Sequence, residues 1–172
     1  LDADTPRRVM EAAGHHEPAD FSGDGRQLVV VEEHSSFDQD LFVVDVATGT
    51  GRNLTSHTRG TDVRFQSPRF TADGRALLVL TDHDREHMNL AMLRLDDASN
   101  GAVRFVIEDD HDIDVFELSR DARYGAAVFN FDGYSRLRLY DLHDPTHPRM
   151  ISEPALPPGV IGTVSFSGDG RS

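Results

Sequence analysis

Short apolar runs alternate with polar turns along nearly the whole chain. Residues 28–31 and 77–80 are uninterrupted apolar runs, which are typical of strands buried on both faces. Residues 136–142 partly alternate between arginine and apolar side chains, as a strand with one solvent-facing side does. Asp, Gly, Asn and Pro bound these runs, and this combination is the signature of strands joined by hairpins. The pattern predicts an all-β protein.

A six-residue motif recurs four times. Phe-Ser-Gly-Asp-Gly-Arg begins at residue 21, and related segments begin at residues 70, 118 and 166, at intervals of 49, 48 and 48 residues. Three further strand-like runs follow each of the first three copies. Because the segment that ends in the motif supplies one more strand, we expect units of four strands.

A four-stranded unit of this length cannot bury both of its faces alone, whereas stacking units around an axis buries them. We therefore predict a β-propeller fragment with about three four-stranded blades plus the first strand of a fourth. The partial propeller occupies residues 17–172. Its blades are expected at about residues 17–55, 64–107 and 112–152, and a fourth blade begins at 161–172 with 161–167 as its first strand.

The first sixteen residues do not fit the repeat. Thr5 and Pro6 followed by residues 7–13 predict a short capped helix with proline at its first position. Residues 1–16 are interpreted either as an N-terminal extension or as the remnant of a preceding blade. Since the chain starts at Leu1 rather than Met and stops inside a motif, we expect it to be a segment of a longer protein.

The Asp-Gly step of the motif has a mechanical explanation. A tight turn needs a positive φ that Gly adopts freely, and Asp can accept hydrogen bonds from the turn backbone. The third copy has Ala122 in place of Gly, so its turn should use another geometry or carry strain. An Asp repeated in every unit is interpreted as structural rather than as a calcium ligand or catalytic group. The predicted turn residues are Asp24, Gly25, Asp73, Gly74, Asp121, Asp169 and Gly170.

Composition narrows the possible functions. The 172 residues include 17 basic residues, all of them Arg, and 30 acidic residues, for a net charge of −13. This balance argues against binding to nucleic acid and against a polybasic membrane anchor. The sequence has no Cys, which excludes disulfides, thiolate zinc sites and a cysteine nucleophile. No apolar run is long enough to span a bilayer.

The remaining polar clusters predict no metal site and no cofactor. His83 and His87 are four residues apart but lie in a predicted loop without a His-Glu-x-x-His pattern. Residues 109–112 are acidic but lack the spacing of a calcium loop, and we interpret them as a solvated link between blades. Repeated aromatic positions on the strands are interpreted as core: Phe21, Phe42, Phe70, Phe129 and Phe166.

The repeat resembles a known one. The motif at residues 21–26, a strand, a second strand ending in Asp45, a Thr-Gly turn and Arg-x-Leu-Thr ending at Thr55 resemble the PD40 (WD40-like) repeat. That repeat occurs in TolB-like propellers and in the N-terminal propeller of the prolyl oligopeptidase (S9) serine peptidases. Four further features are similar to parts of S9 propellers: residues 85–90, residues 114–119, residues 131–137 together with 140–142, and residues 156–160.

In the S9 family, the catalytic Ser-Asp-His triad lies in a C-terminal α/β-hydrolase domain, and the propeller covers the active site and filters substrates by size. This sequence has no Gly-x-Ser-x-Gly nucleophile elbow, so no catalytic residue can be transferred and the chain alone should be inactive. Some members bind the substrate amino terminus with a Glu pair. By that analogy Glu32 and Glu33 are candidates for substrate binding, and the alternative is a solvated strand end.

Three functions follow as hypotheses. The first is a substrate-gating or scaffold propeller of an S9-type peptidase, whose partners are the missing hydrolase domain and peptide substrates. The second is a TolB-like scaffold that docks a protein, and the third is a stand-alone binding protein. The S9 hypothesis favours the cytoplasm, and the TolB hypothesis favours the periplasm. Uncovered blade edges predict self-association, either by completing a ring or by exchanging strand 161–167.

Overall fold

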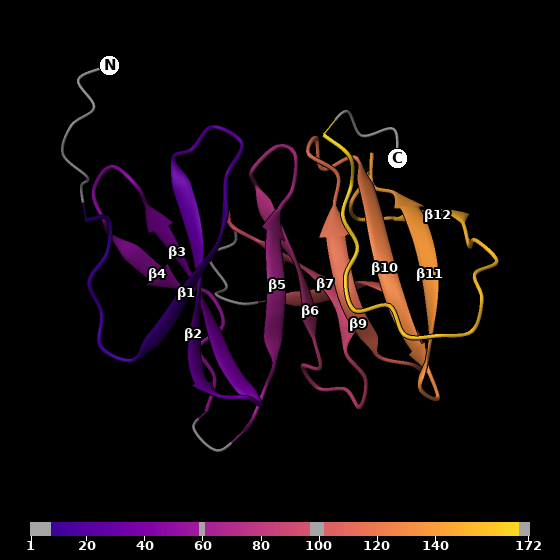
Figure 1. The fold of residues 1–172 in the computed structure, drawn as a ribbon. Helices are drawn as coiled ribbons and strands as arrows, with labels where there is room; N and C mark the ends of the chain where they lie inside the picture. Colours follow the sequence, from indigo (N-terminus) through magenta and orange to yellow (C-terminus); the bar gives the residue numbers. More distant parts are fainter. Residues whose placement is uncertain (1–7, 59–60, 97–101, 169–172) are drawn as a thin grey trace.

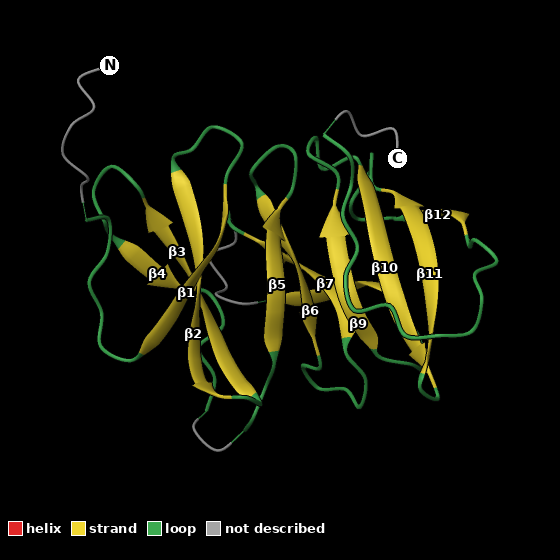
Figure 2. Cartoon of the chain, viewed as in Figure 1, coloured by secondary structure: helices red, strands yellow, loops and turns green. Residues whose placement is uncertain are grey.

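The computed structural model describes residues 8–58, 61–96 and 102–168. These residues form twelve strands and no helix, arranged as three four-stranded antiparallel sheets (Figure 2). The predicted all-β class and the three four-stranded blades are therefore confirmed. No helix in this described part of the chain is long and apolar enough to cross a membrane.

Each blade is a meander in which every strand pairs with the next one along the chain. Blade 1 consists of β1 (His15–Phe21), β2 (Gln27–Ser35), β3 (Asp38–Asp45) and β4 (Gly51–Asn53). Blade 2 consists of β5 (Phe65–Phe70), β6 (Ala76–Thr81), β7 (Asn89–Arg94) and β8 (Val103–Ile107). Blade 3 consists of β9 (Ile113–Leu118), β10 (Tyr124–Phe131), β11 (Tyr134–Asp141) and β12 (Arg149–Ser152).

The three blades follow one another in chain order, with their first strands side by side (Figure 1). β1 contacts β5, and β5 contacts β9. We call β1, β5 and β9 the inner strands. Their convergence is what radial stacking of blades around an axis requires.

Two apolar cores hold neighbouring blades together. Leu41 and Phe65 belong to the core between blades 1 and 2, and Phe116 and Phe129 belong to the core between blades 2 and 3. All four side chains are among the most completely buried of the described residues. Because blade 2 is covered on both faces, all six residues of β6 are buried, which explains its uninterrupted apolar sequence.

The outer face of blade 1 carries a smaller apolar cluster that includes Val30 and Val44. Val9 and Met10 pack against it, and residues 8–14 form no helix. The predicted helix is therefore wrong over its described residues. A segment this short is not stable as an isolated helix, so packing against the sheet decides its conformation.

The segment expected to open a fourth blade is described up to residue 168; Asp169 and Gly170 lie outside the described residues. Within residues 161–168 there is no strand. This segment is attached to blade 3 instead, because Ile161 N donates to Ser135 Oγ at 2.9 Å and Ser135 N donates to Gly159 O at 2.8 Å. The three sheets of the described residues consist of β1–β12, so this segment adds no strand to any of them.

The repeated aromatic residues divide according to whether a blade covers them. Phe70 and Phe129 are buried, and Phe42 and Phe166 are half-buried. Phe21, by contrast, is 54% exposed. Phe21 ends β1 just as Phe70 ends β5, but Phe70 packs in the core between blades 1 and 2 while no described blade precedes Phe21. The prediction of core packing is therefore wrong for Phe21.

Candidate binding site on the inner strands

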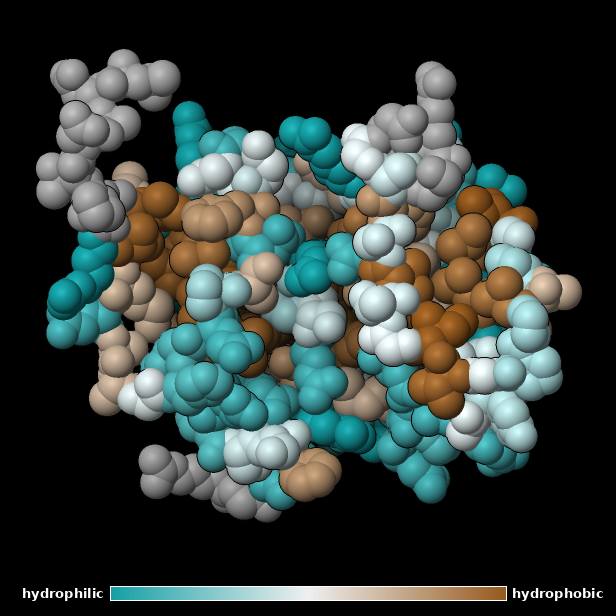
Figure 3. All heavy atoms as spheres, viewed as in Figure 1, coloured by the Kyte–Doolittle hydropathy of each residue, from teal (hydrophilic) through white to brown (hydrophobic). Residues whose placement is uncertain are grey.

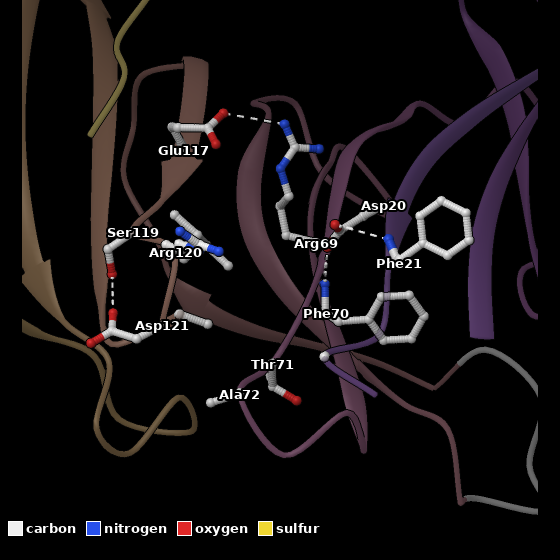
Figure 4. A pocket seen from close by; sticks show the side chains of 13 residues that line it. Asp20, Phe21, Arg69, Phe70, Thr71, Ala72, Glu117, Ser119, Arg120 and Asp121 are labelled. Atoms are coloured by element: carbon white, nitrogen blue, oxygen red, sulfur yellow. Dashed lines mark hydrogen bonds and ion pairs between the residues drawn. The ribbon is translucent and has the colours of Figure 1, made fainter. Parts of the chain in front are cut away.

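The inner strands end around a shared cavity (Figure 4). Each inner strand ends in the first residue of the repeated motif, so the turns of the three blades gather at one end. A cavity of about 410 Å³ opens among them. Its lining includes Asp20, Phe21, Arg69, Phe70, Glu117 and Arg120.

A charged residue stands directly before the motif in each blade: Asp20, Arg69 and Glu117. Arg69 Nη2 donates to Glu117 Oε2 at 3.2 Å, which joins blades 2 and 3. Asp20 Oδ2 accepts a hydrogen bond from Phe70 N at 2.9 Å, which joins blades 1 and 2. The cavity thus presents carboxylate and guanidinium groups beside the exposed ring of Phe21, a combination suited to binding amide and charged groups of a ligand.

The turns after the inner strands share one hydrogen-bond pattern. In blade 2, Thr71 Oγ1 donates to Asp73 Oδ1 at 2.7 Å, and Arg75 N donates to the same oxygen at 3.0 Å. These two bonds hold the pKa of the Asp73 carboxyl below its ordinary value. The other two described copies repeat the hydroxyl-to-carboxylate bond through Ser22 with Asp24 and Ser119 with Asp121. Each turn is therefore closed from within, before any ligand is considered.

Comparisons with known proteins place this fold. No protein-family model matches the sequence, and no curated protein matches it. Among solved structures, a TolB-assigned protein from Agrobacterium tumefaciens is 18% identical, with 92% of this chain and 57% of that chain covered and a TM-score of 0.65. Prolyl oligopeptidase B from Galerina marginata is 16% identical, with 80% and 19% covered and a TM-score of 0.64. Puromycin hydrolase is 19% identical, with 80% and 22% covered and a TM-score of 0.59.

The chain has the fold of the TolB and prolyl oligopeptidase propellers. The resemblance predicted from the repeated motif is thereby confirmed for the architecture. This TolB/oligopeptidase-type propeller spans 57% of the TolB-assigned chain and 19% of the oligopeptidase chain. The shared feature is the propeller fold, and a fold alone does not determine function.

Glu32 and Glu33, the predicted substrate-binding candidates, do not converge. They are consecutive residues of β2, the second strand of the propeller blade, and consecutive strand residues face opposite sides of a sheet. Glu33 Oε2 lies 2.7 Å from His15 Nδ1, whereas Glu32 lies near His16 and His34. Neither of them lines the cavity between the inner strands. Their role in substrate binding stays a prediction.

The three charged residues that stand before the motif were not singled out from the sequence. The sequence does contain a signal for them. The residue directly before the motif is charged in each of the first three repeats, at positions 20, 69 and 117. In a propeller this position falls at the end of the inner strand, where equivalent residues of successive blades come together. Comparing the repeats at that position would have identified Asp20, Arg69 and Glu117.

Two loops with clustered polar residues also have defined positions. His83 Nδ1 lies 3.5 Å from Asp84 Oδ2, whereas His87 Nδ1 lies 3.6 Å from Asp112 Oδ1. The two histidines therefore have different acidic neighbours. The link at 109–112 is more than a solvated connection, because the Asp109 carboxylate accepts a hydrogen bond from Arg138 at 2.6 Å. In addition, the ring of His111 stacks on that of Phe131 at 3.8 Å between centroids. The link therefore fastens blade 2 to blade 3.

Proposed function

We propose that this chain is the propeller of an S9-type serine peptidase, where it restricts peptide access to a catalytic α/β-hydrolase domain. The observation that carries the proposal is the cavity at the ends of the inner strands, with Asp20, Arg69 and Glu117 on its wall. A peptide offers amide groups, a positive amino terminus and a negative carboxyl terminus. Side chains of both signs at one opening are complementary to these groups.

In this proposal the Arg69–Glu117 ion pair limits the opening between blades 2 and 3. Both side chains are partly exposed, at 27% and 31%, so the pair is accessible from the cavity. Removing either side chain widens the opening and leaves the other charge without its partner. Long peptides, which must pass the propeller, then gain access, whereas short substrates are hardly affected.

A second candidate function is a TolB-like scaffold that docks a protein partner through its loops. The TolB-assigned structure favours it, since that alignment covers 92% of this chain, against 80% for prolyl oligopeptidase B. In this case the inner-strand cavity is a docking site for a protein segment. No catalytic domain is then required.

The test uses the whole protein, expressed from the reading frame that contains this chain. Hydrolysis of a short aminoacyl p-nitroanilide and of a long proline-containing peptide is compared for the unsubstituted protein, Arg69→Ala and Glu117→Ala. We expect the ratio of long-peptide to short-substrate hydrolysis to rise in both variants. Arg94→Ala is the matched control, because Arg94 forms an exposed pair with Asp96 and does not line the cavity.

The outcomes separate the two functions. An unchanged ratio in both variants overturns gating at this cavity. A whole protein that hydrolyses neither substrate and whose reading frame contains further repeats without Gly-x-Ser-x-Gly supports the TolB-like scaffold. The 172-residue chain by itself should release no p-nitroaniline, and measurable turnover by it contradicts the assignment as a non-catalytic propeller.

A further inference from the structure

Three potential metal ligands converge on the outer face of blade 1. In the pairing of β2 with β3, Glu32 lies opposite Asp40. The register shifts between Glu33 and Ser35, so His34 is the extra residue of a β-bulge, and a bulge redirects the side chain it carries. His34 Nε2 lies 3.4 Å from Asp40 Oδ2 and 3.7 Å from Glu32 Oε2. One ligand atom from each residue lies within 4.8 Å of the other two.

These separations match a transition-metal site. Zn²⁺ binds nitrogen and oxygen ligands at roughly 2.0–2.2 Å in a tetrahedron, which places neighbouring ligand atoms about 3.3 Å apart. The observed distances of 3.4 and 3.7 Å need only small side-chain movements to reach this geometry. Asp40 is buried whereas the side chain of His34 is 42% exposed, so the site has an anchored ligand and an open side for water.

The charges at this position favour a cation. In the described part of the chain, every ion-pair partner of Glu32 and Asp40 is a histidine: His16, His34 or His57. No Arg is among these partners, so two neighbouring carboxylates, one of them buried, have only histidines as ion-pair partners among the described residues. A divalent cation bound by both carboxylates removes the repulsion and compensates the charge of Asp40.

The Asp40 carboxylate is also held in place by hydrogen bonds from two residues outside the proposed ligand set. Asn53 Nδ2 donates to Asp40 Oδ2 at 3.0 Å, and Thr55 Oγ1 donates to Oδ1 at 3.1 Å. Outer contacts of this kind fix the orientation of a ligating carboxylate and raise metal affinity. The residues that provide them come from β4 and the segment after it, so the whole blade supports the ligand.

Blade 2 shows that the blade architecture does not require these carboxylates. Forty-nine residues after Glu32, His34 and Asp40 stand Thr81, His83 and Asn89. Thr81 of β6 lies opposite Asn89 of β7, just as Glu32 lies opposite Asp40. Thr81 and Asn89 are almost completely buried. Neutral side chains therefore fill the same positions in blade 2. Both blades have a histidine at the third position, His34 and His83, but only blade 1 combines it with two carboxylates.

We propose that Glu32, His34 and Asp40 bind one divalent transition-metal ion, with Zn²⁺ as the ion best suited to their mixed nitrogen and oxygen ligands. The site is independent of the inner-strand cavity and of the peptidase or scaffold function. It lies on the outer face of blade 1, beside the apolar cluster covered by Val9 and Met10. Bound metal links β2 to β3 and thereby stabilises this blade.

The test is a calorimetric titration of the 172-residue chain with ZnCl₂ at neutral pH, together with thermal unfolding with and without Zn²⁺. We expect one Zn²⁺ per chain and a higher unfolding temperature when it is bound. Glu32→Gln and His34→Gln should each weaken binding at least tenfold and lose the increase in unfolding temperature. His83→Gln is the matched control, since it removes the histidine at the equivalent position of blade 2 and should leave zinc binding unchanged.

Two results overturn the proposal. One is the absence of any calorimetric binding by the unsubstituted chain. The other is binding that survives unchanged in Glu32→Gln and His34→Gln, which assigns the metal to surface histidines elsewhere. Unfolding without metal is compared for all variants, and since both substituted side chains are partly exposed, we expect their folding to be retained. Glu32→Asp should restore part of the affinity, because it returns the carboxylate at a shorter reach.

Discussion

Ala122 adopts the left-handed turn conformation that Gly74 adopts one blade earlier, with φ angles of 53° and 65°. Ala122 N donates to Ser119 O at 2.7 Å, and Gly74 N donates to Thr71 O at 2.8 Å, so the two turns are closed in the same way. The sequence left two expectations for this turn. A different turn geometry is wrong, because Ala122 adopts the same geometry as Gly74, and the expectation of strain remains. The strain arises because the Cβ of an L-residue crowds the backbone at positive φ.

Ala122→Gly should therefore stabilise the protein by about 0.5–1 kcal/mol, because relief of the positive-φ strain exceeds the greater flexibility of Gly in the unfolded chain. The free energy of unfolding from urea denaturation checks this value. The reciprocal change Gly74→Ala should destabilise the protein by a similar amount. Its new Cβ meets Ser22 Cβ at 3.8 Å, an ordinary contact, so the effect reports the backbone alone. A destabilised Ala122→Gly variant contradicts the argument.

Gly125 is required for packing rather than for a turn. A Cβ at this position lies 2.9 Å from Leu142 Cδ1 and 3.0 Å from Phe116 Cε2, inside the core between blades 2 and 3. Gly125→Ala should destabilise the protein by about 1–3 kcal/mol through overpacking. Gly51→Ala is the control, because its nearest contact is 3.6 Å, and its unfolding free energy should change by less than about 0.5 kcal/mol.

Arg138 makes a second ionic connection between blades 2 and 3, in addition to the Arg69–Glu117 pair. Its guanidinium donates to Asp109 at 2.6 Å and to Glu153 at 2.9 Å, and it lies over the ring of Phe129 at 4.2 Å. Burial disfavours the charged form of Asp109, but hydrogen bonds from Arg138 and His111 outweigh it and hold the pKa of that carboxyl below its ordinary value. Both partners of the ion pair are largely covered, at 17% and 18% side-chain exposure.

Arg138→Gln should destabilise the protein by about 2–4 kcal/mol, since it leaves a largely buried carboxylate without its cation. Urea denaturation measures this loss. Arg149→Gln serves for comparison, because Arg149 is 72% exposed and pairs with Asp141 at 3.1 Å. An exposed pair contributes little, so this control should lose no more than about 0.5–1 kcal/mol. Equal losses in the two variants exclude the role assigned to Arg138.

The motif turns make the protein sensitive to acid. The hydroxyl of Thr71 and the backbone N–H of Arg75 lower the pKa of Asp73 from its ordinary 3.8, so the folded state binds this proton less readily than the unfolded state. The resulting stability is complete above about pH 4 and is lost as the pH falls through the lowered pKa. Asp73→Asn should be less stable than the unsubstituted protein at neutral pH, and the difference should shrink in acid. A difference that is independent of pH contradicts this mechanism.

The blades could be predicted from the sequence because a propeller repeats local contacts. Each strand pairs with its neighbour in the chain, so the spacing of the motif between residues 21 and 166 already contains the strand order. Which face of a blade is covered depends on the adjacent blade and is not a local property. Phe21 and Phe70 occupy the same motif position, yet one is 54% exposed and the other 4%.

The candidate sites depend on relationships that strand patterns do not contain. The inner-strand cavity brings together Arg69 and Glu117 from different blades, and only radial stacking makes them neighbours. The proposed metal site depends on the bulge at His34, which sets the distance from that side chain to Asp40. The two-residue spacing of Glu32 and His34 was visible in the sequence, but the register that brings Asp40 opposite Glu32 was not.

The row of blades leaves apolar side chains on its surface near both ends (Figure 3). After β12 begins, four apolar residues are at least 44% exposed: Met150, Ile151, Leu156 and Val160. Several exposed apolar side chains in one segment favour association with another molecule. The region around β12 is therefore where we expect copies of this chain to meet.

We therefore expect the 172-residue chain to self-associate at micromolar concentration, which light scattering coupled to size-exclusion chromatography measures. Replacing Leu156 and Val160 by Glu should shift the population toward monomer, because the charges must be desolvated in an apolar contact. Phe37→Glu is the matched control: this side chain is 63% exposed and lies between β2 and β3, away from β12. A monodisperse monomer of the unsubstituted chain contradicts the prediction. Equal loss of association in the control instead places the contact at the β2–β3 turn rather than beside β12.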